Sequence, residues 1–255
     1  MPTDAGKAIM TPHTALKQTS HRPWPLPERN WAMRQEWNDL AFLHWEIAPA
    51  ELQPHLPPGV ELDLHGGTAW IGVVPFDMKG VTRRGFPAWS PVSDFPEINV
   101  RTYVTVGGKP GVWFFSLDVP SRLAVWAART FYHLPYFHAR MSVRKTGEAV
   151  HYAHRRGELA FIANYRPAEK IEAEPGSFEN WATERYCLYT ADRSGRLYRG
   201  EVHHPRWPLH RAEIEITENT MLQGWNTGPM HPSVLFSRHL PVVVWPLERL
   251  TQSTP

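Results

Sequence analysis

The stretch SRLAVWAARTFYHLPYFHA, residues 121–139, predicts a helix followed by a proline turn and a strand. Ser121 is a favoured N-cap residue, because its hydroxyl can accept a hydrogen bond from the first helical turn. Pro135 ends the helix, since the residue before a proline is pushed toward extended geometry. The residues that fall at helical spacing along one side are Leu123, Trp126, Ala127, Thr130 and Leu134.

Elsewhere the chain alternates short apolar runs with turns rich in proline and glycine. We expect strands over residues 40–47, 60–64, 68–74, 98–106, 112–119, 137–144, 149–155, 159–165, 185–191, 195–204, 210–218 and 241–245. Short helices are expected at 49–56 and 177–183, and a hairpin at His65-Gly66-Gly67. This pattern favours a mainly β (α+β), antiparallel domain, although periodicity alone leaves barrel and sandwich open.

Composition narrows the function classes. The chain has 255 residues, 42% of them hydrophobic and 20% charged, with a net charge of +2. This near-neutral balance gives no support for nucleic-acid binding. No run approaches the ~18 apolar residues of a membrane span, and residues 1–20 lack the apolar core of a signal peptide. The lone Cys187 excludes an intrachain disulfide, so we expect a buried thiol and a cytoplasmic protein.

The N-terminal segment differs from the rest of the chain. Residues 1–30 are polar and rich in proline, and they lack any alternating apolar pattern. We expect a disordered tip that continues into an extended arm lying on the body of the protein. The arm is assigned to residues 1–21 and a single β domain to residues 22–250.

The strand expected at 98–106 carries the strongest polar pattern. Its apolar side consists of Ile98, Val100, Thr102, Val104 and Val106. The opposite side, if the strand is extended by one residue to Glu97, carries Glu97, Asn99, Arg101 and Tyr103. Because side chains two apart share a face, these four polar groups would point together into the lumen of a barrel. A confined arginine can anchor a carboxylate, a glutamate can move a proton, and a tyrosine can donate to an oxyanion.

A structural explanation of the same residues also stays open. Arg101 could pair with Glu97 or Glu184 and simply plug the end of the barrel, because buried charges occur mainly as pairs. Under the functional interpretation, Glu97 and Glu184 are the candidate catalytic residues. The candidate ligand-binding residues are Asn99, Arg101, Tyr103, Arg129, Tyr132, Tyr136, His138 and Tyr186.

Other chemistries have little support in the sequence. The 14 histidines form neither a His-x-His pair nor an HExxH helix, so no metal site is predicted. No phosphate-binding glycine motif or serine nucleophile elbow occurs, and no cofactor is expected. An imine-forming lysine must be buried or lie beside a cation to be deprotonated near neutral pH. Of the six lysines only Lys79 follows an apolar run, and we expect it at the surface.

Several stretches also carry a family resemblance. They are LAFLHW (40–45), LPPGVEL (56–62), AWIGVVPF (69–76), FPEINVRTYV (95–104), GVWFFSLD (111–118), LPYF (134–137), TERY (183–186) and VVVWP (242–246). In this order they resemble an uncharacterised bacterial family grouped with the acetoacetate decarboxylase-like superfamily. The resemblance implies a cone-like antiparallel β barrel around a small-molecule pocket.

The same resemblance predicts an absence. Decarboxylases of that superfamily carry a Schiff-base lysine after the proline turn, and they act on β-keto acids. Tyr136 and Phe137 occupy the corresponding positions here. We therefore expect a pocket for an organic acid or carbonyl compound without a Schiff-base lysine. Non-imine lyase or isomerase chemistry, a non-catalytic binding protein, a structural protein with a filled barrel, and a homo-oligomer all remain open.

Overall fold

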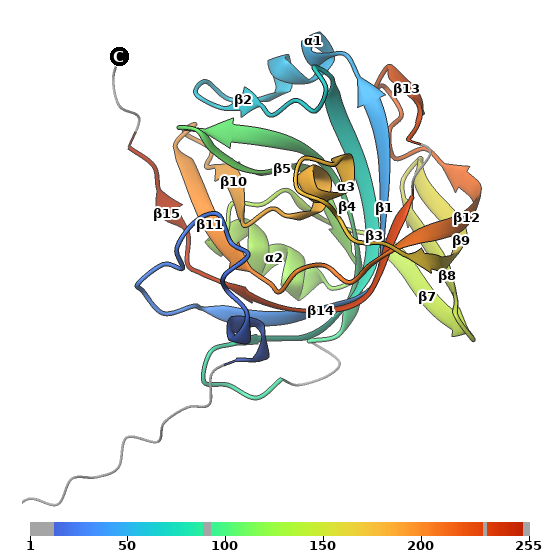
Figure 1. Cartoon of the computed structure of the whole chain (residues 1–255), viewed down its shortest axis with the longest axis horizontal. Helices are drawn as coiled ribbons and strands as arrows, with labels where there is room; N and C mark the ends of the chain where they lie inside the picture. The colour runs from blue at the N-terminus through green and yellow to red at the C-terminus, as the bar shows by residue number, and fades with distance from the viewer. Residues whose placement is uncertain (1–12, 89–92, 232–233, 252–255) are drawn as a thin grey trace, which may run out of the picture.

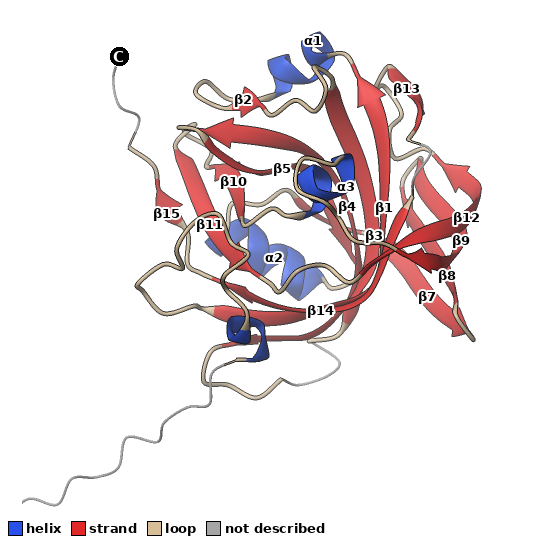
Figure 2. Cartoon of the chain, in the orientation of Figure 1, coloured by secondary structure: helices blue, strands red, loops and turns tan. Residues whose placement is uncertain are grey.

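The computed structural model describes residues 13–88, 93–231 and 234–251, and its main feature is a closed ring of strands (Figures 1 and 2). The ring consists of β1 (Met33–Ile47), β3 (Ala69–Arg83), β4 (Phe95–Val106), β5 (Lys109–Val119), β10 (Cys187–Ala191), β11 (Leu197–His203) and β14 (Leu235–Val244). It closes because β1 pairs with β3 on one edge and with β14 on the other. Closure satisfies the edge strands that an open sheet would expose. The mainly β, barrel-like fold class is thus confirmed.

One ring contact departs from antiparallel pairing. β5 and β10 run parallel, with Leu188 opposite Val112. The short strand β6 (Tyr136–His138), which follows the proline turn, also pairs parallel with β5. Both contacts require a crossover connection, because parallel neighbours cannot be joined by a tight hairpin.

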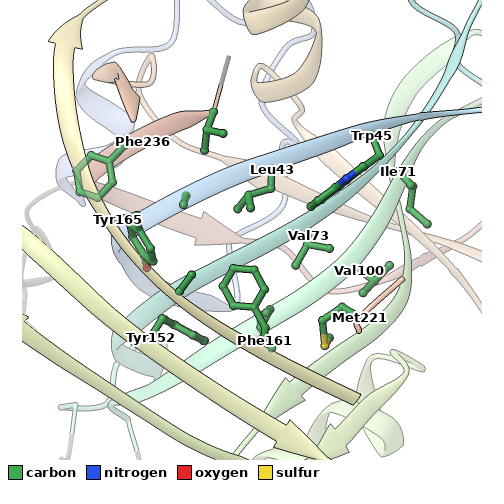
Figure 3. Packing of buried hydrophobic residues seen from close by; sticks show 14 of the residues in the cluster. Leu43, Trp45, Ile71, Val73, Val100, Tyr152, Phe161, Tyr165, Met221 and Phe236 are labelled. Atoms are coloured by element: carbon green, nitrogen blue, oxygen red, sulfur yellow. The ribbon is translucent and has the colours of Figure 1, made fainter. Parts of the chain in front are cut away.

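A second group of strands continues the sheet outside the ring. It comprises β12 (Leu209–Asn219), β9 (Leu159–Lys170), β8 (Ala149–Arg156) and β7 (Arg140–Thr146), joined to the ring through β14. The main hydrophobic core lies between this group and the outer face of β1, β3 and β4. In Figure 3, Tyr152 and Phe161 of the outer strands lie opposite Leu43, Val73 and Val100 of the ring. All five side chains are at most 3% exposed.

A bulge at Asp39 divides the side chains of β1 between the outer core and a second hydrophobic core inside the ring. Asp39 has φ 49°, a left-handed conformation that Asp adopts more readily than bulky residues do. After it, Leu40 and Phe42 point toward the ring interior, whereas Ala41 and Leu43 join the outer core. The buried Asp39 carboxylate forms ion pairs with Lys145 and Arg238.

The helix α2 (Arg122–Phe131) begins as predicted, but the apolar side read from the sequence faces outward. The Ser121 hydroxyl caps it by accepting from the Ala124 backbone N–H at 3.2 Å. Leu123 and Trp126 are 61% and 58% exposed, while Ala124 and Val125 pack on the inner core. The side of α2 that packs on the core carries small residues. The spacing of the large apolar residues therefore pointed to the opposite side of the helix.

The remaining elements are short. They are η1 (Thr14–Lys17), α1 (Pro49–Leu52), η2 (Gln53–His55), β2 (Glu61–Leu62), α3 (Phe178–Thr183), β13 (Thr227–Met230) and β15 (Glu248–Arg249). The expected hairpin is wrong in its pairing. His65 and Thr68 form an isolated bridge, but β2 pairs with β4 rather than β3. None of the helices in the described part of the chain is long and apolar enough to cross a membrane.

The described part of the N-terminal segment lies on the ring. Ala15 is fully buried against Val243 and Trp245. Arg22 forms a buried ion pair with Glu201 of β11 at 3.0 Å. The expected disordered tip at 1–12 lies outside the described residues.

Candidate functional site

A cavity lies inside the ring, with α2 near one end and α3 near the other; Figure 1 shows both helices within the outline of the ring. The cavity has a volume of about 140 Å³. A single buried water needs ~10–15 Å³, so the cavity has room for more than one water. Most of its wall is apolar: Leu40, Val74, Phe76, Met78, Val112, Phe114, Leu117, Ala128, Leu134, Leu188, Val202, Trp207 and Val244. A largely apolar enclosure with a few convergent polar groups is the usual form of a ligand pocket.

Strand β4 contributes three polar side chains to this wall. Glu97, Asn99 and Arg101 all line the cavity, as the alternation of the sequence predicted. Ile98 and Val100 point the other way, into the core between the ring and the outer strands. The strand register of β4 therefore decides which side chains face the cavity and which face the core. A shift of one residue would send the polar side chains into the core and the apolar ones into the cavity.

Glu97 is a carboxyl group without a cationic partner among the described residues. It is 2% exposed and accepts a 2.7 Å hydrogen bond from the Tyr136 hydroxyl. Burial raises its pKa to about 7, opposed by hydrogen bonds from Tyr136 and Asn99 and assisted by the nearby charge of Asp118. The Tyr152 hydroxyl also donates to the Glu97 carbonyl oxygen at 2.8 Å and fixes the strand behind it. A carboxyl group with this pKa can donate or accept a proton near neutral pH.

Arg101 has no carboxylate partner within the residues that the structure describes. Its Nη2 donates to the Tyr103 hydroxyl at 3.2 Å and to the Ala182 carbonyl at 3.4 Å. Its Nε is buried and makes no hydrogen bond in the described structure. Among the described residues it forms no ion pair with Glu97 or Glu184, the two partners that the structural explanation would give it. An unpaired donor in a closed cavity is costly and available to an anion.

Tyr103 supports Arg101 from behind the cavity wall. Its hydroxyl lies 2.6 Å from Nε2 of His44. Burial, followed by the charges of Arg101 and His231, lowers the pKa of His44 well below its usual value, so the ring is neutral. A neutral ring nitrogen can accept the Tyr103 hydroxyl hydrogen while the Tyr103 oxygen accepts from Arg101. The sequence predicted that Tyr103 would line the cavity, but in the structure Tyr103 lies behind Arg101 and is not a lining residue.

Four further sequence-predicted residues lie off the cavity wall. The Tyr186 hydroxyl donates to the Glu184 carboxylate, which also accepts from the Trp207 backbone N–H at 3.3 Å. Strand β10 begins only at Cys187, so Glu184 belongs to the end of α3 and does not share a strand face with Tyr186. The other two residues lie near the proline turn: the Arg129 Nε donates to the Tyr136 carbonyl at 2.6 Å, and His138 is exposed. Tyr132 and Tyr136 do line the cavity.

Arg185 is a wall residue that the sequence analysis missed. It forms an ion pair with Asp63, its Nε donates to the Trp181 carbonyl, and its buried Nη2 has no hydrogen-bond partner in the described structure. Its guanidinium lies 5.0 Å from the Tyr103 ring, and that of Arg101 lies 5.5 Å from the same ring. The segment Thr183-Glu184-Arg185-Tyr186 contains the predicted residues Glu184 and Tyr186, but nothing in its pattern favours the arginine.

No described lysine is on the cavity wall. Lys79 is 43% exposed and pairs with Asp77 at 3.0 Å, and Lys109 pairs with the buried Glu201. Within the described ranges no cluster of three or more His, Cys, Asp or Glu side chains could hold a metal ion. Cys187 reaches the wall, but burial raises its thiol pKa to about 11, which makes it a poor nucleophile.

Comparisons with solved structures agree with this architecture. The fold is similar to that of the enduracididine biosynthesis enzyme MppR, complexed with the condensation product of pyruvate and imidazole 4-carboxaldehyde (TM-score 0.64, 11% identity, covering 88% of this chain and 90% of that one). It is also similar to acetoacetate decarboxylase from Legionella pneumophila (TM-score 0.62, 14% identity, 90% and 93% covered). At these identities the likeness concerns the fold alone.

Two sequence comparisons place the chain more closely. It is 43% identical over 230 residues to the uncharacterised protein YqjF of Bacillus subtilis (strain 168), covering 88% of this chain and 95% of that protein. The family model DUF2071, described as an uncharacterised conserved protein, matches residues 34–241. The cavity strand β4 and the proline turn both fall within this match. The chain therefore belongs to the DUF2071 family.

Proposed function

We propose that this protein binds a small organic acid or carbonyl compound inside the ring, where Arg101 holds a carboxylate and Glu97 moves a proton. The observation that carries the proposal is the Arg101 guanidinium, which lines an apolar cavity without a carboxylate partner among the described residues. A half-buried cation in an apolar cavity that has no carboxylate partner among the described residues gains most from an anionic ligand. The solved structure of MppR with a pyruvate-derived product supports the same class of ligand for this fold.

Glu97 gives the site its capacity for chemistry. As a carboxylate it can take a proton from the carbon next to a ligand carbonyl. The C–H bond breaks, its electron pair moves onto the carbonyl oxygen, and an O–H bond forms on Glu97. The Tyr136 hydroxyl, which contacts Glu97, can donate to the developing enolate oxygen. Return of the proton to the same or another carbon completes an exchange or an isomerisation.

This chemistry does not use an imine. The wall position after the proline turn is Tyr136, and every described lysine lies elsewhere. A Schiff base with a keto acid requires a desolvated amine, and no lysine in the described part of the chain supplies one on the cavity wall. Trapping with borohydride in the presence of pyruvate or acetoacetate is expected to leave the protein mass unchanged.

The test combines binding with proton exchange. Calorimetry with oxo acids measures the affinity, and NMR in D₂O measures deuterium incorporation next to the carbonyl. We expect Arg101→Gln to weaken binding at least about tenfold, because it removes a charge-assisted hydrogen bond. Glu97→Gln should abolish exchange while binding persists. Arg166→Gln is the matched control, since Arg166 is 59% exposed and pairs with Glu213.

The outcomes separate the alternatives. Binding that depends on Arg101 without any exchange would identify a non-catalytic carrier or sensor with the same pocket. Absence of binding by every oxo acid tested would favour a structural protein and reject the proposal. The cytoplasmic location and a homo-oligomer stay predictions, and sedimentation velocity measures the latter.

A further inference from the structure

The charged side chains on the cavity wall, Glu97, Arg101 and Arg185, form two separate poles. The first pole contains Arg101 and Arg185 and lies beside α3, since Arg101 donates to the Ala182 carbonyl of that helix. The second contains Glu97 and Tyr136 and lies beside the proline turn after α2. Glu97 and Arg101 are four residues apart on one strand, which separates their Cα atoms by about 13 Å.

The two poles differ in charge. At the first, two guanidinium groups flank the Tyr103 ring, and Asp63 pairs with one of them. Two cations and one carboxylate leave a single positive charge, which one ligand carboxylate would neutralise. At the second, burial raises the pKa of Glu97 to about 7 and no described cation faces it. A second ligand carboxylate there would be desolvated and repelled by ionised Glu97.

The wall between the poles is apolar. Val74 and Leu117 are the cross-strand neighbours of Asn99, which lies midway between Glu97 and Arg101. Both side chains line the cavity. Asn99 Oδ1 is buried and has no hydrogen-bond partner in the described structure, so a hydroxyl hydrogen could be accepted there.

From this arrangement we infer that the ligand is an elongated monocarboxylate, with its carboxylate at Arg101 and a neutral carbonyl or hydroxyl group at Glu97, joined by an apolar chain. The inference rests on the proposed function and makes it specific. A short 2-oxo or 3-oxo acid cannot contact both poles at once. The proton that Glu97 moves would then lie beside the remote carbonyl, several carbons from the bound carboxylate.

A series of unbranched oxo acids tests the inference by calorimetry at pH 7. The probes are pyruvate, acetoacetate, 4-oxopentanoate, 5-oxohexanoate, 6-oxoheptanoate and 7-oxooctanoate. We expect affinity to rise by up to about fourfold per added methylene, until both ends reach their poles. Octanoate lacks the remote carbonyl and should bind about threefold or more weakly than 7-oxooctanoate. Octanedioate, which carries a second charge, should also bind more weakly.

Variants assign each end of the ligand. Arg101→Gln should weaken binding of octanoate and 7-oxooctanoate alike. Tyr136→Phe should remove the advantage of 7-oxooctanoate over octanoate while leaving octanoate affinity within about twofold. Glu97→Gln should keep this advantage, because the glutamine amide N–H can still donate to the remote carbonyl. Arg166→Gln should change neither, and thermal melting of each variant confirms that it is folded.

The outcomes distinguish the inference from the proposed function. If pyruvate or acetoacetate binds as tightly as 7-oxooctanoate and depends on Arg101, the carboxylate site stands and the two-pole ligand is rejected. The ligand class is also rejected if the carbonyl advantage is absent or survives Tyr136→Phe. If no monocarboxylate binds, or if Arg101→Gln has no effect on binding, the proposed function itself fails.

Discussion

The Tyr136 hydroxyl donates a 2.7 Å hydrogen bond to Oε2 of Glu97 and so links the proline turn after α2 to strand β4 of the ring. The two residues are 39 positions apart and meet only because β6 pairs with β5, which pairs with β4. Burial raises the pKa of the Tyr136 hydroxyl well above its usual value, so it remains a donor across the physiological range. The contact therefore couples the helix end of the cavity to its proton-carrying group.

Folding stability should depend on pH through Glu97. Its pKa rises from 4.5 to about 7 on folding because the carboxyl group is buried. Between these values the unfolded chain binds fewer protons than the folded protein, so stability falls as pH rises. Relative to Glu97→Gln, we expect the wild type to lose about 3 kcal/mol between pH 4.5 and 8. Urea unfolding of both proteins across this range measures it, and a pH-independent difference would refute the assignment.

Tyr136→Phe should raise the pKa of Glu97 further. The phenolic hydrogen bond favours the ionised carboxyl group, so removing it favours the protonated form. A carbon-13 NMR titration of the carboxyl groups, assigned with Glu97→Gln, measures this change. Tyr152→Phe is the matched control, because the Tyr152 hydroxyl donates to the Glu97 main-chain carbonyl instead. An equal or larger effect of the control would contradict the prediction.

Arg101→Met should cost the ligand-free protein little stability. The substitution removes a guanidinium that has no ion pair in the described structure, and it keeps the volume that packs near the Phe42 ring, 5.2 Å away. Replacing a partly buried charge that has no ion pair by an apolar group of similar size is often neutral or stabilising. We expect a change within about 1 kcal/mol in urea unfolding. A large loss would mean that Arg101 has a structural role.

Gly111→Ala should destabilise the parallel contact between β5 and β10. A Cβ at Gly111 would lie 2.6 Å from Cε2 of Tyr189 and 2.8 Å from Sγ of Cys187, and it would also lie 2.8 Å from the Cys187 carbonyl. Overpacking of this kind typically costs about 1–3 kcal/mol. Gly228→Ala is the control, because its nearest neighbour would be 3.5 Å away. Thermal unfolding compares the two, and equal melting temperatures would contradict the argument.

Glu201→Gln should be among the most damaging single changes. Glu201 is 3% exposed and forms ion pairs with Arg22, Lys109 and Arg199. Removing its charge leaves buried cations without a counter-ion, which typically costs about 3–5 kcal/mol. Glu213→Gln breaks an exposed pair with Arg166 and should cost less than about 1 kcal/mol. Similar losses in the two variants would show that the buried network contributes little.

Local chemistry made several features predictable from the sequence. The Ser121 cap and the Pro135 turn depend on side-chain hydrogen bonding and on the fixed proline ring, so they appear where the sequence placed them. The alternation along residues 97–101 depends only on the two-residue period of a strand. It therefore predicted which side chains of β4 would share a face before any partner strand was known.

Features that depend on distant contacts could not be predicted in this way. The sequence identified Glu184 as readily as Arg185, but the end of α3 turns the arginine to the cavity and the glutamate to Tyr186. The outward apolar side of α2 followed from the small residues Ala124 and Val125 that the ring interior accepts. Such choices reflect packing between elements, which periodicity within one element does not contain.

The sequence by itself determined a mainly β chain with one capped helix and a polar strand face, because these follow from steric and hydrogen-bonding preferences over a few residues. Only the tertiary structure decided that β1 closes the ring against β14, and that Glu97 and Arg101 line one cavity in which Arg101 has no counter-ion among the described residues. Burial and pairing are set by whichever groups the fold brings together from distant positions, so the charge states of the site are properties of the closed ring.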